Sequence, residues 1–144
     1  IISWRTIPGG GTTDYAVEIY HEAIKKKKYV CFLKKDTELP MMFMDDAIKA
    51  TVDIMLSKPN DIKIRSSYNL AAISFTPKEI SESIKKHIPD FKISYRPDYR
   101  QNIADSWPKS INDSYARQDW NWKHRFALDE ITEEMIFQLN KKYK

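Results

Sequence analysis

The stretch Pro8-Gly9-Gly10-Gly11-Thr12-Thr13-Asp14-Tyr15 contains all three glycines of the chain and predicts a loop that leads into a helix. Thr12 and Thr13 are residue types that cap helix N-termini, and Asp14 complements the positive end of the helix dipole. Apolar residues follow at helical spacing, and the basic run over residues 25–28 ends the helix where cations complement its carbonyls.

The adjacency of the glycines excludes two motifs that bind nucleotide phosphates. A G-x-G-x-x-G dinucleotide loop needs separated glycines, and a phosphate-binding P-loop needs G-x-x-x-x-G-K-[ST]. The chain contains neither pattern, and no tyrosine is followed four residues later by a lysine. The Tyr-Lys proton-transfer pair is therefore absent as well.

Length and composition predict one globular domain. The chain has 144 residues, of which 42% are hydrophobic and 31% charged. No apolar run approaches the roughly 18 residues of a membrane span, and a net charge of +4 with interspersed acids does not indicate nucleic-acid binding. We expect neither a membrane nor a nucleic acid as partner. The opening Ile1-Ile2-Ser3-Trp4, with no signal segment or initiator methionine, suggests a piece of something longer.

The lone cysteine excludes a disulfide framework. Cys31 lies among apolar residues that predict a buried strand, so we interpret it as a structural thiol in a reducing compartment.

Further along the chain, strands and helices alternate, which favours an α/β or α+β fold. The pattern predicts strands over 1–7, 29–34, 68–75 and 91–95. Asp45-Asp46 is expected to cap a helix with an apolar stripe, and Thr76-Pro77-Lys78-Glu79 has the form of a capping box. A final helix over 128–143 is expected to be capped by Asp129. Its predicted buried stripe is Ile131, Met135 and Leu139, and that of the Asp45-Asp46 helix is Ala47, Ile48, Val52 and Met55.

The side chains that could carry chemistry are scattered. The histidines are far apart, so no metal site is predicted, and His21 and His87 lie among lysines on predicted helices, where solvent exposure is the expectation. No serine has a histidine and an aspartate at a triad spacing.

Two segments keep alternative interpretations open. The free N–H groups of Gly9-Gly10-Gly11-Thr12-Thr13 and the hydroxyls of the two threonines could bind a carboxylate or phosphate at a helix start, or this segment could form a plain loop and cap. Trp107, in the turn Asp105-Ser106-Trp107-Pro108, could pack in the core or close a pocket.

Several motifs together resemble the short-chain-dehydrogenase type of L-threonine 3-dehydrogenase, within the extended NAD-dependent epimerase/dehydratase family. The resemblance spans essentially the whole chain in consistent order and corresponds to the C-terminal part of such an enzyme. The motifs that carry it are Pro8-Gly9-Gly10-Gly11-Thr12-Thr13-Asp14-Tyr15-Ala16, Leu39-Pro40-Met41-Met42-Phe43-Met44-Asp45-Asp46-Ala47, Ser74-Phe75-Thr76-Pro77, Ile103-Ala104-Asp105-Ser106-Trp107-Pro108 and Ala116-Arg117-Gln118-Asp119-Trp120-Asn121-Trp122.

This resemblance implies an α/β fold, the C-terminal portion of an extended Rossmann-type dehydrogenase. Segments 1–7 and 41–75 would belong to the Rossmann side, and segments 8–40 and 76–144 to a small substrate-binding domain interleaved with it. Asn121 stands where the related Asp-Trp-Gly-Trp pattern has glycine, which predicts a positive φ there.

For function, the resemblance implies NAD-dependent oxidation of L-threonine to 2-amino-3-ketobutyrate by a homodimeric parent in the cytoplasm, or in mitochondria if the source is eukaryotic. The NAD loop and the catalytic residues would lie in a missing N-terminal half, so no catalytic residue is expected here and the chain alone should be inactive. Gly11, Thr12 and Thr13 would lie near the carboxylate of the amino-acid substrate, and Trp107 would form an aromatic wall. Two alternatives are a non-catalytic module that binds small anions and a part of a sugar-nucleotide epimerase or dehydratase.

Overall fold

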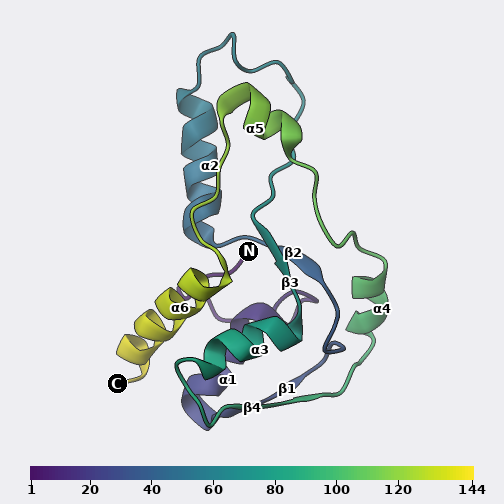
Figure 1. Cartoon of the computed structure of the whole chain (residues 1–144), viewed down its shortest axis with the longest axis vertical. Helices are drawn as coiled ribbons and strands as arrows, with labels where there is room; N and C mark the ends of the chain where they lie inside the picture. Colours follow the sequence, from purple (N-terminus) through teal and green to yellow (C-terminus); the bar gives the residue numbers. More distant parts are fainter.

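The computed structural model describes residues 1–144 and divides them between a large core and a smaller apolar cluster (Figure 1). Helices and short strands alternate along the chain, which confirms the α/β expectation for the C-terminal portion of a Rossmann-type dehydrogenase. The helices are α1 (Tyr15–Lys26), α2 (Met44–Leu56), α3 (Pro77–Lys85), α4 (Arg100–Asp105), α5 (Ser114–Trp120) and α6 (Leu128–Tyr143). The strands are β1 (Lys28–Cys31), β2 (Leu39–Met41), β3 (Ile73–Phe75) and β4 (Lys92–Tyr95).

The large core is enclosed by α1, α3 and α6 together with two small sheets. β1 and β4 pair in parallel, with Lys28 opposite Lys92, and β2 and β3 pair antiparallel. Twenty-three buried residues form this core, which lies in the lower half of Figure 1. One polar network crosses it, because the Tyr20 hydroxyl lies 2.9 Å from the Thr132 hydroxyl, which also accepts a 2.8 Å hydrogen bond from Ser83.

The small cluster lies where α2 and α5 run side by side in the upper half of Figure 1. It contains only five buried residues: Met42, Ala50, Ala116, Trp120 and Trp122. The Trp122 indole N–H donates a 2.9 Å hydrogen bond to the Ala71 carbonyl, which fastens the loop before β3 to this cluster.

Three local predictions are confirmed. Thr76 and Glu79 form the capping box of α3, with each side chain accepting from the other residue's backbone N–H. Asn121 ends α5 with φ 57°, the left-handed conformation inferred from the glycine of the related pattern. α6 spans the expected residues and buries its predicted stripe of Ile131, Met135 and Leu139.

The expected capping roles of Asp46 and Asp129 are wrong, because both carboxylates have partners far away in sequence. Asp46 is fully buried and accepts hydrogen bonds from the Arg125 and Phe126 amides at 2.9 and 3.1 Å. Asp129 accepts from the Ser83 hydroxyl and pairs with Lys86, each at 2.6 Å. Phe43 and Ala127 stand at the N-cap positions of the two helices without side-chain caps.

Two of the predicted strands are much shorter than expected. Within residues 1–7, only Ile2 makes a β-bridge, with Phe43. Within residues 68–75, only Ile73–Phe75 forms a strand, because Tyr68 and Leu70 pack against the small cluster instead.

Of the predicted stripe of α2, only Ala47 packs against a core, that of the small cluster. Ile48, Val52 and Met55 are 55%, 45% and 76% exposed, while the buried Ala50 faces the small cluster. α5, which falls in the predicted substrate segment 76–144, packs against α2 from the predicted Rossmann segment 41–75. The division of the chain between the two domains stays a prediction.

His21 is also not solvent-exposed as expected. Its ring is buried against α6, with Nδ1 lying 2.5 Å from the Tyr143 hydroxyl. Burial, followed by Lys25 and Lys142, lowers the pKa of His21. His87 is exposed as predicted. Cys31 is fully buried, and burial raises the pKa of its thiol to about 11, which confirms the structural interpretation.

Candidate functional site

The glycine loop, residues 8–13, is held by a carboxylate from its own chain. Asp14 Oδ2 accepts hydrogen bonds from the Gly9 N–H at 2.7 Å and from the Gly11 N–H at 2.9 Å. Asp14 is the N-cap residue of α1, but its side chain bonds backward to the loop and makes no cap hydrogen bond. Two of the loop amides expected to be free for an anion are therefore already satisfied.

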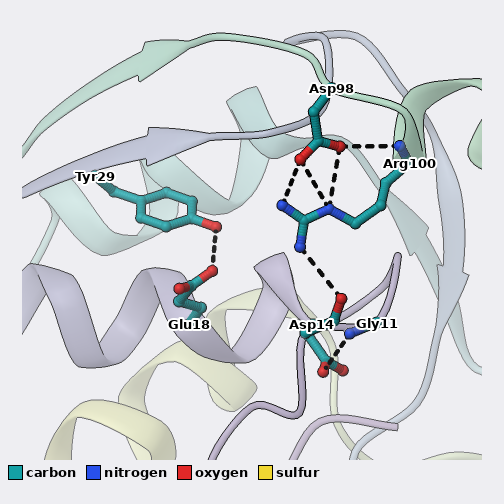
Figure 2. Close-up of polar contacts among 7 residues, drawn as sticks. Gly11, Asp14, Glu18, Tyr29, Asp98 and Arg100 are labelled. Atoms are coloured by element: carbon teal, nitrogen blue, oxygen red, sulfur yellow. Dashed lines mark hydrogen bonds and ion pairs between the residues drawn. The ribbon is translucent and has the colours of Figure 1, made fainter.

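Arg100 holds the same loop from the opposite side (Figure 2). Its guanidinium donates to the Gly10 carbonyl at 3.2 Å and forms a short ion pair with Asp98, with an Nη2–Oδ2 distance of 2.6 Å. The guanidinium carbon lies 3.2 Å from the centre of the Phe32 ring. Hydrogen bonding by Arg100 lowers the pKa of Asp98, so this pair stays charged well below neutral pH.

These residues line an open cavity of about 710 Å³ beside β1. Gly9, Gly10 and Arg100 form part of its wall together with Glu18 and Phe32. The Tyr29 hydroxyl donates a 2.9 Å hydrogen bond to Glu18, and burial together with this carboxylate raises the pKa of Tyr29. Tyr29 is therefore a neutral hydrogen-bond donor and not a base.

The two threonines of the loop lie directly before α1. Thr12 is buried and Thr13 is partly buried. No backbone hydrogen bond within the chain uses the N–H of either residue, although the Thr13 carbonyl accepts from Ala16. These two amides lie directly before the start of α1, where the helix dipole favours a negative charge. They are the part of the predicted anion site that remains available.

Trp107 follows α4 in the tight turn predicted from the sequence. Its N–H donates to the Ala104 carbonyl at 3.1 Å, and its side chain is 43% exposed. This exposure excludes the core interpretation. The indole lines a separate cavity of about 250 Å³ with Lys34, Asp36 and Asp105.

The structure therefore places the expected site residues at two separate positions and not in one pocket of this chain. Gly11, Thr12 and Thr13 lie at the start of α1, and Trp107 lies beyond the end of α4. The residue that connects them, Arg100, was not singled out from the sequence. The only signal for it was the charged segment Arg96-Pro97-Asp98-Tyr99-Arg100 directly after a strand.

The residues of this chain do not fit the phosphates of a dinucleotide cofactor. The only glycine loop has two amides occupied by Asp14, so it lacks the run of free N–H groups that surrounds a phosphate. A more apolar cleft of about 360 Å³ lies elsewhere, between Ile1, Met42 and the segment Leu70-Ala71-Ala72. It has no cluster of donors for a pyrophosphate.

No helix in the structure is both long enough and apolar enough to cross a membrane.

Comparison with known proteins was made both by sequence and by fold. No family model matches the sequence. The mitochondrial L-threonine 3-dehydrogenase of Bos taurus is 49% identical over 137 residues, covering 94% of this chain and 36% of the bovine protein. An uncharacterised epimerase/dehydratase of Staphylococcus haemolyticus is 46% identical over 99% of this chain and 45% of that protein. The crystal structure of L-threonine dehydrogenase from Phytophthora infestans superposes with a TM-score of 0.95 at 52% identity, covering 98% of this chain and 46% of that one.

Over almost its whole length the chain is similar to L-threonine 3-dehydrogenases. It spans less than half the length of these three relatives. As the resemblance implied, it matches a C-terminal part of such a protein.

Proposed function

We propose that this chain is the substrate-binding part of an NAD-dependent L-threonine 3-dehydrogenase, which oxidises L-threonine to 2-amino-3-ketobutyrate. The observation that carries the proposal is the 49–52% identity to threonine dehydrogenases over at least 94% of the chain. Hydride transfer would occur with NAD held by a segment outside this chain, because the residues present offer no phosphate loop and no Tyr-x-x-x-Lys pair.

The free backbone donors of Thr12 and Thr13 support the binding of an amino-acid substrate. A carboxylate at the start of α1 would accept hydrogen bonds from these amides and gain from the helix dipole. The Gly11 backbone would leave room for a substrate beside it, because the only neighbour near the position of a Cβ is the Asp14 carboxylate at 3.6 Å.

The exposed indole of Trp107 supports a covering role. An exposed tryptophan in a turn fixed by hydrogen bonds can pack over a small substrate, and in this way it would exclude water from the reacting carbon. No residue of this chain is assigned a catalytic role.

Exposed apolar side chains support the proposal that the N-terminal part of the enzyme packs against this chain. Ile1, Ile48 and Met55 are all more than half exposed, and Ile1 borders the 360 Å³ cleft. Large apolar side chains left exposed near an apolar cleft favour a binding role for this surface. A segment equivalent to the unmatched part of the relatives would cover this side of the molecule. The homodimeric state of the parent stays an expectation.

The proposal is tested by joining the unmatched N-terminal part of the Phytophthora infestans enzyme to this chain. We expect NADH formation that depends on L-threonine from the joined protein and none from either part alone. The same N-terminal part joined to its own C-terminal part is the positive control. An active control with an inactive joined protein refutes the proposal, and so does threonine oxidation by this chain alone.

The similarity to the staphylococcal epimerase/dehydratase favours one second candidate, a sugar-nucleotide epimerase or dehydratase. The same joined protein distinguishes the two, because conversion of a UDP-sugar without threonine oxidation would select the second.

A further inference from the structure

We propose that Arg100 is a positioning residue. By contacting the glycine loop from the first turn of α4, it fixes the position of that loop relative to Trp107, which follows the same helix. This inference rests on the proposed function in that it takes the loop and Trp107 as the two substrate-binding segments. It adds the contact that fixes one relative to the other.

The first argument is that three consecutive glycines are each held by a hydrogen bond. Asp14 accepts from the N–H of Gly9 and Gly11, and Arg100 donates to the carbonyl of Gly10 between them. Gly10 has φ +91°, a conformation that other residues rarely adopt. A tri-glycine segment is otherwise the most flexible backbone available, so these contacts determine its conformation.

The second argument is that Arg100 is itself fixed before it reaches the loop. Asp98 accepts from Nε at 3.1 Å and from Nη2 at 2.6 Å (Figure 2), and the guanidinium lies over the Phe32 ring. With these donors engaged, Nη1 is directed at the Gly10 carbonyl. The planar fork of arginine can make all of these contacts together, and the single ammonium of lysine cannot.

The third argument is the short path from Arg100 to Trp107. Arg100 is the first residue of α4, and Trp107 is the second residue after its end. Six residues of helix span about 9 Å, too short a distance for the two ends to move independently. Gln101 fixes the helix further, because its side-chain oxygen accepts from the Lys34 N–H at 2.7 Å and its amide donates to the Thr37 hydroxyl at 3.0 Å.

The contacts of the loop, of Arg100 and of α4 together predict how Arg100 affects substrate binding. With Arg100 in place, the threonine amides and the indole are held at one separation, as substrate binding requires. Without it, the Gly10 carbonyl is released and the loop samples other conformations. The substrate then meets a disordered carboxylate site, which weakens binding more than it slows the chemical step.

The first experiment measures hydrogen exchange at the Gly9 and Gly11 amides in the 144-residue chain. We expect Arg100→Gln and Arg100→Lys each to accelerate this exchange about tenfold, because the loop opens more often. Arg65→Gln is the matched control, since it removes the same charge from an exposed side chain with no hydrogen bond or ion pair. Unprotected amides in the unaltered chain, or full protection in Arg100→Lys, would overturn the proposal.

The second experiment measures kinetics in the joined protein described above. We expect Arg100→Gln and Arg100→Lys to raise the KM for L-threonine about tenfold while kcat stays within about twofold. Arg65→Gln should change neither constant. An active joined protein whose KM is unaffected by either Arg100 variant contradicts the proposal. A joined protein that does not oxidise threonine refutes the proposed function, and the exchange measurement alone then decides on Arg100.

Discussion

The large core and the small cluster differ in how completely this chain encloses them. α1, α3 and α6 surround the large core, and their apolar faces meet one another. In the small cluster α5 covers only one side of α2, and Ile48, Val52 and Met55 on another side stay exposed. Apolar residues at helical spacing are therefore buried in the large core but left exposed on α2. The difference indicates that the large core can be stable with the residues of this chain alone.

The largest expected effect tests this difference directly. Ile84 is fully buried in the large core, so Ile84→Ala should lower the free energy of unfolding by about 3 kcal/mol. Ile48→Ala, on the exposed face of α2, should change it by less than about 0.5 kcal/mol. Denaturant unfolding of both variants measures the two values. Equal losses would show that the exposed face is covered in solution.

The second-largest effect is expected at Asp46, which connects the two regions. Asp46 on α2 accepts the Arg125 and Phe126 amides in the segment that leads into α6. Asp46→Ala leaves these amides without their acceptor and should cost about 2 kcal/mol. The neighbouring Asp45 is the control, because its exposed side chain makes no hydrogen bond or ion pair, and Asp45→Ala should be nearly neutral. A small effect at Asp46 would mean that the regions are not coupled through it.

A smaller effect is expected within the small cluster. Asn121 has φ 57°, so Asn121→Ala should destabilise the chain by about 1 kcal/mol. Asn121→Gly should be neutral or slightly stabilising, because glycine adopts this conformation without strain. Thermal unfolding of the two variants measures the difference. The opposite order would contradict the left-handed geometry.

The smallest effect concerns pH and belongs to the large core. Burial lowers the pKa of His21 below its unfolded value of about 6.5. Below that pH the unfolded chain takes up a proton that the folded chain does not. The free energy of unfolding therefore decreases as the pH is lowered, until the pH reaches the pKa of His21 in the folded chain. His21→Gln should remove this part of the pH dependence, and His87→Gln should keep it. Unfolding curves at several pH values provide the measurement.

Local signals in the sequence predicted local structure well. The capping box at Thr76, the end of α1 at its lysines and the stripe of α6 each involve residues within one or two helical turns. Such contacts are fixed by spacing along the chain, so they can be inferred without knowing the fold.

Two of the failures involve partners distant in sequence. Asp46 was expected to cap a helix but accepts amides 79 and 80 residues away, and His21 meets Tyr143 122 residues away. The candidate site follows the same rule. The threonine loop and Trp107 were found through motif resemblance, but the Arg100–Gly10 contact spans 90 residues and had no local signature.

The position of α6 has a consequence for synthesis of the chain. α1 and α6 share one core although they are far apart in sequence, since Tyr20 and Thr132 are separated by 112 residues. During translation, all residues between α1 and α6 must be synthesised before Leu139 can complete this core. Until then the partly made chain exposes apolar faces of α1 and α3, the kind of surface that chaperones bind.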